Sequence, residues 1–502
     1  MKKLLALAAA LALLCAAPAG AVLAADVPDS ISADKIDQYL LSAMKAGKIP
    51  GLSAAIVRGD EVVYLEGFGN AGGGRTVTPQ TPFTVCSVGK TFTALAIRQL
   101  AGQGKLSYDS PVQAYIPWFT LADPEAAKQI TIGDLVGHRS GLSRQAGTAA
   151  YTYNANLSIE DVVRSLKDVL PDLPVGQTEE YSNLNFIILG LVVEKVSGMS
   201  YGDYVQKNIF DPLDMANSFT DEAQSKRHGS ATGHSVAFGL AVPANMPFPK
   251  GQMPAGYQLA SAEDMAKFAM LYLSNGYVGG KSIIENNPLE QRKPPYDGYL
   301  VLEQRYNIYW MPTNGPVNGN MGYYGHEGGT SNFTSMLLIN PATKTAIVVL
   351  ANCNNGSSGP VLSAATIAGD LSAYLETGRE LPTPAAGFAL QWVYAAALAA
   401  VVALLTFRAL GTIRFPRSLA GGGRRRAFTL ASSALLDGAL PLTVLLALPP
   451  ALRATWPLLL GAYVLPASLI LLASAALLAM FAAKTVMLLV SKRAERPTET
   501  VQ

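Results

Sequence analysis

Strand-like patterns of hydrophobic and polar positions occur near both ends of the first 380 residues. The stretch 51–71 alternates on either side of Gly59-Asp60, which predicts two antiparallel strands joined by a tight turn. Later strand-like runs are Tyr299–Trp310, Ser331–Asn340 and Thr345–Asn352. Strands at both ends with helices between them imply an antiparallel sheet assembled from the two ends, plus an inserted helical region.

Helical spacing of apolar residues dominates the stretch between these strands. Phe92, Leu95, Ala96 and Leu100 recur every three or four positions, which predicts a buried helix from about Ser87 onward. Further helices are predicted at Ile31–Gly47, Ile130–Val136, Ser158–Leu170, Leu184–Val196, Ser261–Ser274 and Ser358–Tyr374.

Three apolar runs follow, each long enough to cross a bilayer as a helix, at about Phe388–Phe407, Ala427–Leu448 and Pro457–Ala483. Lys and Arg residues cluster between the first two runs and after the third, whereas Arg453 alone lies between the second and third. Because positively charged loops stay in the cytoplasm, we expect an exported domain before the first run and a cytoplasmic C-terminus. The fold class expected is therefore α+β, an antiparallel sheet flanked by helices with an all-helical region, followed by three transmembrane helices.

The first residues have the form of a secretory signal. A basic start, an apolar core and small residues near Ala24 predict cleavage at about that point. Cys15 raises a lipoprotein alternative, which the large Leu14 before it disfavours. The expected division is a signal peptide at 1–24, an exported domain at 25–379, a linker at 380–387 and a multi-pass anchor in the cell membrane at 388–502.

Charge separates the two large parts of the chain. Residues 388–502 carry eleven Lys or Arg and three Asp or Glu, a net of +8, which leaves −6 for residues 1–387 because the whole chain carries +2. A mildly acidic domain without a basic patch is not a nucleic-acid binder. Beyond the signal, only Cys86 and Cys353 remain, and they fit neither a disulfide framework nor a zinc pattern. We expect two buried thiols, with a Cys86–Cys353 bridge as the alternative, and no metal or cofactor.

Ser87-x-x-Lys90 places a hydroxyl and an ammonium on one face of the first turn of the predicted helix. Unpaired backbone N–H groups at a helix N-terminus favour developing negative charge, so this is a plausible position for a nucleophile. The spacing alone decides nothing, since Ser42-x-x-Lys45 repeats it in an ordinary amphipathic helix. The alternative reading is a helix cap and a solvated lysine.

Two further motifs accompany this pair. Tyr181 is the only one of 21 tyrosines with Asn two places later, and His326 is the only one of four histidines with Gly two places later. The order Ser-x-x-Lys, Tyr-x-Asn, His-x-Gly resembles the serine β-lactamase and penicillin-binding protein family, specifically its class C-like branch. Supporting fragments are Gly137–Leu142, Asp211–Met215, Ala231–His234, Pro254–Gly256 and Gly325–Thr330.

The resemblance implies a nucleophilic serine, Ser87, that forms an acyl-enzyme. A serine hydroxyl is a poor nucleophile until a base takes its proton. A desolvated Lys90 would have a lowered pKa, and Tyr181 beside it would act as phenolate or proton relay, so the two share the acid and base roles. By the same resemblance, Asn183 holds the substrate amide.

Other roles also come from the resemblance. The backbone N–H groups of Ser87 and Gly329 are expected to form an oxyanion hole, and Gln145 to contact the amide side of the substrate. His326 stands where the β-lactamases carry Lys, and a neutral imidazole attracts a carboxylate less strongly than an ammonium does. This departure argues against efficient β-lactamase or carboxypeptidase activity. The other three histidines are expected to be structural.

An exported acyl-enzyme hydrolase on three spans resembles the membrane-bound D-amino peptidases, such as the colibactin-activating peptidase. The expected function is therefore a D-amino-acid-specific peptidase acting on a small peptide or acylated small molecule, with membrane lipid as the other partner and the oligomeric state open. Alternatives are a DD-carboxypeptidase or esterase of the same branch, a β-lactam sensor that is acylated without turnover, and a non-catalytic scaffold.

Asp437 lies near the middle of the second apolar run, where an acid is costly and suggests a function. It is expected either to pair with the polar face of Ser432 and Ser433, or to receive part of a substrate at the membrane. A protonated acid within helix packing is the structural alternative.

Overall fold

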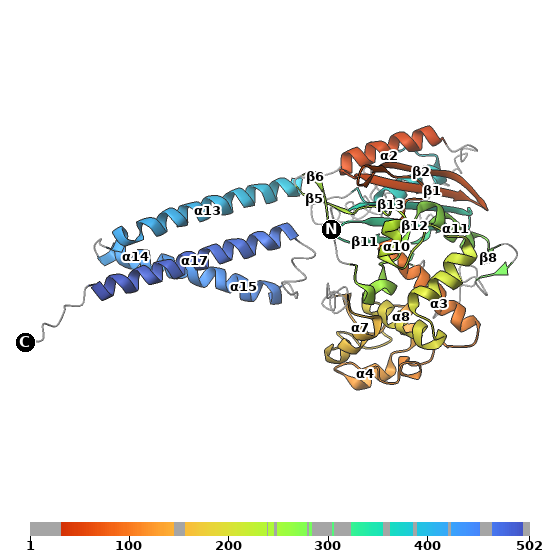
Figure 1. The fold of residues 1–502 in the computed structure, drawn as a ribbon, viewed down its shortest axis with the longest axis horizontal. Coiled ribbons are helices and arrows are strands. Elements are labelled where there is room, and N and C mark those ends of the chain that lie inside the picture. The colour runs from red at the N-terminus through yellow and green to blue at the C-terminus, as the bar shows by residue number, and fades with distance from the viewer. Residues whose placement is uncertain are drawn as a thin grey trace, which may run out of the picture.

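Figure 1 shows a globular domain of helices and strands from which a bundle of long helices projects. This computed structural model describes residues 32–144, 156–237, 239–244, 248–278, 281–283, 304–305, 323–354, 362–384, 389–419, 423–451 and 464–494. The predicted signal peptide, Gln145 and most of the predicted strand Tyr299–Trp310 lie outside the described residues.

The central sheet has seven strands in the order β10-β11-β12-β13-β1-β2-β3. Strand β1 pairs antiparallel with β13, so that Leu52 lies opposite Ala351. The expected sheet built from both ends of the domain is therefore confirmed. The strands are β1 Gly51–Arg58, β2 Glu61–Gly72, β3 Arg75–Thr76, β10 Gln304–Arg305, β11 Tyr324–Gly329, β12 Thr334–Asn340 and β13 Thr345–Ala351.

Helices cover both faces of this sheet, which explains why β12 and β13 are buried along their whole length. The helices α2 (Ala33–Gly47) and α12 (Ala364–Thr377) pack on one face, where Leu40 and Leu371 join a core with Leu338 and Val349. On the other face, α11 (Ala262–Leu273) contributes Phe268 to the larger core. Figure 1 shows α2 and α11 on opposite sides of the strands.

The inserted helical region lies beyond α11. Its main helices are α3 (Lys90–Gly102) and α8 (Asn183–Ser197), which pack against each other in the larger core. Shorter helices surround them: η2 Val112–Ala114, α4 Pro124–Gln129, α5 Ile132–Val136, α7 Ile159–Ser165, η3 Leu166–Asp168, α9 Tyr201–Val205, η4 Gln206–Phe210, η5 Asp211–Leu213, α10 Glu222–Arg227 and η6 Lys250–Ala255.

Small strands complete the domain. They are β4 Phe83–Thr84 with β7 Leu259–Ala260, the three-stranded sheet of β14 Cys353–Asn354, β5 His234–Ala237 and β6 Leu240–Pro243, and the pair β8 Tyr277–Val278 with β9 Lys281–Ser282. Cys86 and Cys353 are free, buried thiols, as expected.

Several predicted boundaries are corrected. The helix expected from Ser87 begins as a 3-10 turn, η1 (Cys86–Gly89), and becomes α-helical only at Lys90. No side chain caps η1, and Cys86 before the serine has a left-handed φ of 50°. The helix that closes the domain begins at Ala364, where the Ser363 hydroxyl caps it, and the predicted start at Ser358 lies outside the described residues.

Three C-terminal stretches are long and apolar enough to span a membrane: Ala396–Pro416, Arg426–Pro449 and Ser468–Val490. The first stretch lies in α13 (Ala389–Leu419) and the third in α17 (Val464–Ala494). The second runs through three consecutive helical elements: α14 (Gly423–Ser433), η7 (Ala434–Ala439) and α15 (Leu440–Ala451). The bent pair Asn183–Ser197 and Tyr201–Leu213 passes the same test of length and composition, but α8 lies in the core of the domain.

The first and third spans lie further along the chain than the hydropathy pattern predicted. Arg408 and Lys484, which were expected outside the membrane, lie within these stretches, and both pair with Asp437. Arg408 donates from two nitrogens to the two carboxylate oxygens of Asp437, each at 2.6 Å, and Lys484 Nζ donates to Oδ2 at 2.6 Å. Ser433 Oγ donates to the same oxygen at 3.0 Å, as expected, whereas Ser432 offers its backbone carbonyl to Arg408. Asp437 thus links all three long helices.

Candidate active site

Ser87 lies in a turn that is enclosed by two glycines from distant parts of the chain. A Cβ on Gly256 would come within 2.7 Å of the Cys86 carbonyl, and its φ of 146° also disfavours a side chain. A Cβ on Gly328 would lie 2.6 Å from the Val85 carbonyl oxygen. The end of η6 and the end of β11 therefore approach the backbone next to Ser87 from two directions.

The structure brings four of the predicted site residues together. Ser87 Oγ lies 2.8 Å from the Tyr181 hydroxyl and 3.1 Å from Lys90 Nζ. Lys90 Nζ donates to Asn183 Oδ1 at 2.7 Å and to the backbone carbonyl of Ala255. Lys90 occupies the start of α3 and Asn183 the start of α8, so the packing of these two helices assembles the cluster.

Burial determines the protonation of Lys90. The side chain is completely buried, and this burial lowers the pKa of Lys90 well below its usual range, with Arg144 acting in the same direction. A neutral amine has two N–H donors and one lone pair. Asn183 Oδ1 and the Ala255 carbonyl accept the two N–H groups, which leaves the lone pair for the Ser87 hydroxyl. The contacts thus suit Lys90 as a base toward Ser87.

Tyr181 lies between cationic and aromatic neighbours. Lys90 Nζ and Arg144 Cζ each lie 4.9 Å from its ring centroid, and the His138 ring is 4.7 Å away. Positive charge on Arg144, and on Lys90 once it has accepted the Ser87 proton, would stabilise negative charge that develops on the phenol oxygen. Its hydroxyl donates to Ser87 Oγ, which leaves the Ser87 proton for the lone pair of Lys90.

His138, expected to be structural, holds the backbone on both sides of Tyr181. Its carbonyl accepts the Glu180 N–H at 2.8 Å, and its Nδ1 accepts the Ser182 N–H at 3.1 Å. Asn185 Nδ2 lies 3.0 Å from the same ring nitrogen. Burial lowers the pKa of His138 well below its usual value, so the ring stays neutral and keeps this acceptor.

We expect His138→Phe to lower kcat by about ten- to a hundredfold, because a misplaced catalytic group costs this order of rate. Phe keeps a ring against Tyr181 but removes the acceptor for Ser182. His138→Asn is the matched variant, since Asn tolerates the left-handed φ of 53° and offers an oxygen acceptor. Steady-state kinetics below the melting temperature should show partial rescue in His138→Asn with KM little changed. Equal kcat in both variants and the native protein would contradict this role.

His326 lies on β11, buried, with its ring centroid 6.3 Å from that of Tyr181. Its Nδ1 is 2.6 Å from the Glu327 carbonyl oxygen, which can only accept, so Nδ1 carries the proton and Nε2 is an acceptor. Burial lowers the pKa of His326 to about 3, and the nearby Lys90 contributes. The imidazole is therefore neutral at physiological pH, as the sequence analysis assumed.

Gly329 and Gln145 are the remaining predicted site residues. Gly329 ends β11 opposite Thr334, next to the glycine that packs against the turn of Ser87. The oxyanion role of the Ser87 and Gly329 amides stays a prediction. Gln145 lies outside the described residues, although Arg144 before it stacks on Tyr181.

Sequence reasoning missed three groups of the site: the Ala255 carbonyl, the His138 ring and the Arg144 guanidinium. The fragments Gly137–Leu142 and Pro254–Gly256 were noted only as signs of a family. Their contacts with Lys90 and Tyr181 depend on chain segments that are more than 35 residues apart, which no local pattern reports.

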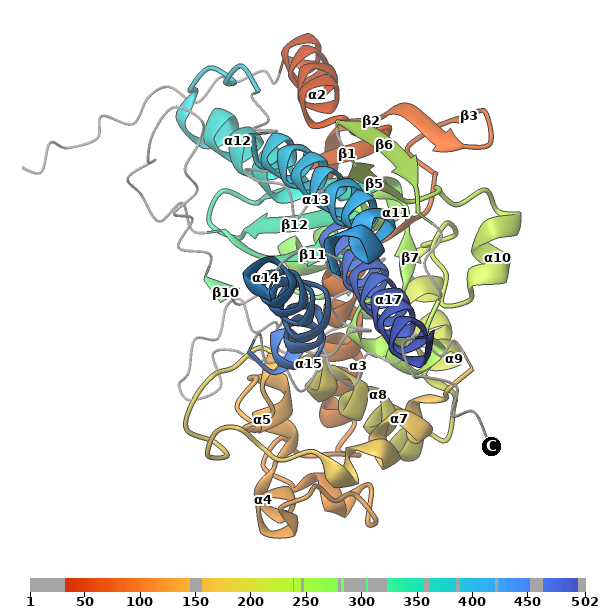
Figure 2. The ribbon, with the colours of Figure 1, turned by 90° about the vertical axis from the view of Figure 1, so that its left-hand side faces the viewer.

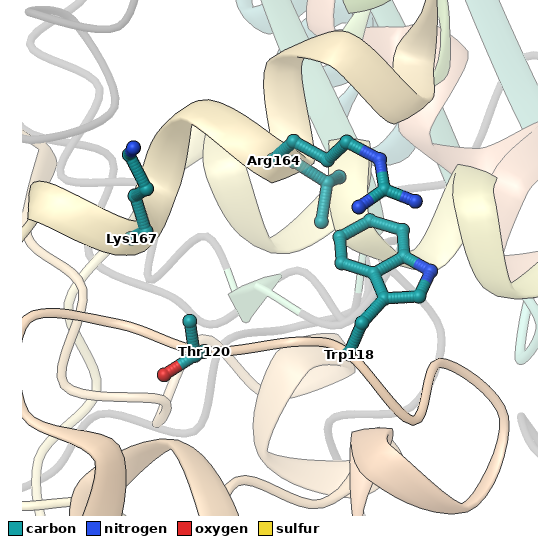
Figure 3. A pocket seen from close by; sticks show the side chains of 5 residues that line it. Trp118, Thr120, Arg164 and Lys167 are labelled. Atoms are coloured by element: carbon teal, nitrogen blue, oxygen red, sulfur yellow. The ribbon is translucent and has the colours of Figure 1, made fainter.

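A separate surface pocket lies in the helical region, with a volume of about 310 Å³ (Figure 3). Within it the Arg164 guanidinium lies 3.8 Å from the centroid of the Trp118 ring and donates to Glu160. The predicted site residues do not line this pocket, whose lining is Trp118, Thr120, Val163, Arg164 and Lys167.

The chain is similar to proteins of known family. The family described as Beta-lactamase matches residues 36–369. Protein flp of Staphylococcus aureus (strain N315) is 28% identical over 338 residues, which cover 64% of each chain. The unguisins hydrolase ungD' of Aspergillus campestris is 27% identical over 346 residues, covering 65% of this chain and 64% of that protein. The match thus spans less than two thirds of the length of these relatives.

Solved structures share the fold. The octameric penicillin-binding protein homologue from Pyrococcus abyssi has a TM-score of 0.56 at 26% identity, covering 70% of this chain and 80% of that one. A class C β-lactamase from Rhodobacter sphaeroides has a TM-score of 0.51 at 22% identity, covering 67% and 97%. The expected fold and resemblance are confirmed. The chain belongs to the beta-lactamase family.

Proposed function

We propose that this protein is a membrane-anchored, extracytoplasmic hydrolase that cleaves amide or ester bonds through an acyl-enzyme on Ser87. The observation that carries the proposal is the contact of Ser87 Oγ with both Lys90 Nζ and the Tyr181 hydroxyl. Asn183, bound to Lys90, completes the cluster on the side of α8.

In the acylation step, Ser87 Oγ attacks the substrate carbonyl carbon and its proton passes to the lone pair of Lys90. The backbone N–H groups of Ser87 and Gly329 receive the developing oxyanion. Tyr181 donates its proton to the leaving nitrogen or oxygen as the scissile bond breaks, and recovers a proton from Lys90. Water then attacks the acyl group with the same residues in reverse roles, so each cycle consumes one water.

The specific activity that we propose is that of a D-amino-acid-specific peptidase. It is supported by the resemblance of the whole architecture, an exported domain followed by three candidate spans, to membrane-bound D-amino peptidases. The neutral His326 fits a substrate without a carboxylate at that position. The similarity to the unguisins hydrolase of Aspergillus campestris supports turnover rather than permanent acylation.

The test is a substrate panel on the purified full chain: N-acyl-D-Asn peptides, D-Ala-D-Ala peptides, p-nitrophenyl esters and nitrocefin. We expect hydrolysis of at least one amide or ester, a mass increase on Ser87 during turnover, and neither in Ser87→Ala. Equal activity in Ser87→Ala would contradict the mechanism. A stable adduct without product release would identify a sensor instead, and preference for D-Ala-D-Ala would identify a carboxypeptidase.

His326→Lys is expected to accelerate acylation by carboxylate-bearing substrates roughly tenfold. An ammonium near a carboxylate gains about 1 to 4 kcal/mol in a partly solvated site, and the neutral imidazole lacks this attraction. The measurement is kcat/KM for nitrocefin and for D-Ala-D-Ala peptides, with an uncharged p-nitrophenyl ester as the matched substrate. An equal change for the uncharged ester would show that charge is not the cause.

A further inference from the structure

The hairpin of β5 and β6 has an uncharged, apolar surface. The sequence between Arg227 and Lys250 contains no Asp, Glu, Lys or Arg. Leu240 and Val242 of β6 point to the same face of their strand and are 68% and 48% exposed. Between them, Ala241 lies opposite the buried Val236 of β5. One face of the hairpin therefore packs on the domain and the other presents large apolar side chains.

This pair differs from the other exposed apolar residues of the described globular domain. Single exposed hydrophobic residues are normal on a protein surface, whereas adjacent ones without nearby charge mark a contact surface. The others come from separate elements or loops: Leu41, Val62, Leu170 and Tyr277.

The hairpin lies on the side of the domain from which the anchor leaves. Figure 1 shows β5 and β6 at the edge of the domain beside the beginning of α13, and Figure 2, seen from the anchor side, shows them next to α13 again. In Figure 1, β8 with Tyr277 lies at the opposite end of the domain.

The connection to the anchor is short. Leu381 packs on the domain core and Glu380 pairs with Lys35 at 3.0 Å, so the domain extends almost to the end of the linker. Residues 389–395 of α13 precede the first candidate span and add only about 10 Å of helix. A bilayer crossed by α13 therefore lies close to the hairpin.

The β5–β6 hairpin is poorly suited to pair with a strand from a second protein. Although β6 is the outer strand of its small sheet, it ends at Pro243, which has no N–H to donate to a neighbour. Proline at an exposed edge opposes strand addition.

We propose that the β5–β6 hairpin contacts the bilayer surface, with Leu240 and Val242 at the boundary between headgroups and acyl chains. This inference rests on the proposed membrane anchoring. The hairpin is also connected to the active-site wall, since Ser235 Oγ donates to the Ser331 carbonyl at 2.7 Å and Asn332 Nδ2 to the Ala244 carbonyl at 2.8 Å. These contacts hold the turn that follows β11, so hairpin contact would fix the site relative to the membrane.

The experiment places an environment-sensitive fluorophore on Leu240→Cys in the full chain, reconstituted in phosphatidylcholine and phosphatidylglycerol vesicles that carry nitroxide-labelled lipid. Tyr277→Cys is the matched control, 55% exposed at the far end of the domain, and the native thiols Cys86 and Cys353 are buried. We expect blue-shifted emission at position 240 and at least about twofold stronger quenching there than at 277, because interfacial residues lie within the headgroup layer. Unchanged hydrolysis of a soluble ester confirms that the labelled chain is folded.

Each outcome separates the two proposals. A chain that does not float with the vesicles would overturn the membrane anchoring itself. A chain that floats while the probe at 240 behaves like the one at 277 would overturn the hairpin contact alone. A blue shift without lipid quenching would indicate contact with a second copy, and it would also overturn the hairpin proposal.

Discussion

Lys90→Met is expected to slow acylation of Ser87 by about 100- to 10,000-fold, the usual contribution of a positioned general base. Met fills a similar volume in the buried site but has no lone pair of sufficient basicity for the Ser87 proton. The loss should appear in kcat/KM and in the rate at which the acyl adduct accumulates, measured by quenched-flow mass spectrometry.

Lys45→Met is the matched control for this variant. It changes the lysine of the second Ser-x-x-Lys sequence, which lies on α2 and makes no contact with the cluster. Its rate should equal that of the native protein. A Lys90→Met rate within a few-fold of native would show that Lys90 is not the base, and would leave Tyr181 as the candidate.

The pH dependence of the acylation rate should follow the protonation of Lys90. Since burial lowers its pKa, the amine is neutral above the lowered value and is protonated below it, so the rate of acylation falls as the pH decreases through that value. Folding stability changes with pH in the same direction as the acylation rate. Between the lowered pKa and the ordinary lysine pKa of 10.5, the unfolded chain binds a proton that the folded chain does not, so the contribution of Lys90 to stability rises with pH. Both trends should disappear in Lys90→Met.

Asp437→Leu is expected to cost the helical anchor about 3 to 5 kcal/mol, because removing one partner of a buried ion pair leaves charge without compensation. Arg408 and Lys484 both donate to this carboxylate, so two cations would remain in the apolar bundle. The result should be a lower melting temperature and faster proteolysis of the full chain in nanodiscs.

The triple variant Arg408→Met, Asp437→Leu, Lys484→Met is the matched control, since it removes all three charges together. Replacement of a buried ionic cluster by apolar residues is often neutral or stabilising, so the triple variant should recover most of the lost stability. If the triple variant melts as low as Asp437→Leu, uncompensated charge is not the cause of the loss. If both match the native protein, the ion pairs contribute nothing measurable.

The strands and the catalytic cluster were largely predictable from the sequence for a physical reason. Alternation and helical spacing record which side of each element is buried, so β1, β2, β12, β13 and α8 were located within a few residues. Ser87, Lys90, Tyr181 and Asn183 could be singled out because acyl transfer requires these residue types in short motifs. Their convergence was an expectation until the packing of α3 on α8 placed them within hydrogen-bonding distance.

Tertiary structure alone decided the contacts that join distant segments. The Ala255 carbonyl, the His138 ring and the Arg144 guanidinium reach the site through backbone turns whose direction no local pattern encodes. In the sequence analysis, Asp437 is likewise paired only with nearby serines, whereas the packing of the three long helices brings Arg408 and Lys484 to its carboxylate. The sequence by itself determined most of the elements, the reactive residue types and the position of the three long apolar helices after the globular domain. Three-dimensional packing decided which charges are neutralised and how the site is oriented, since both depend on neighbours that are remote along the chain.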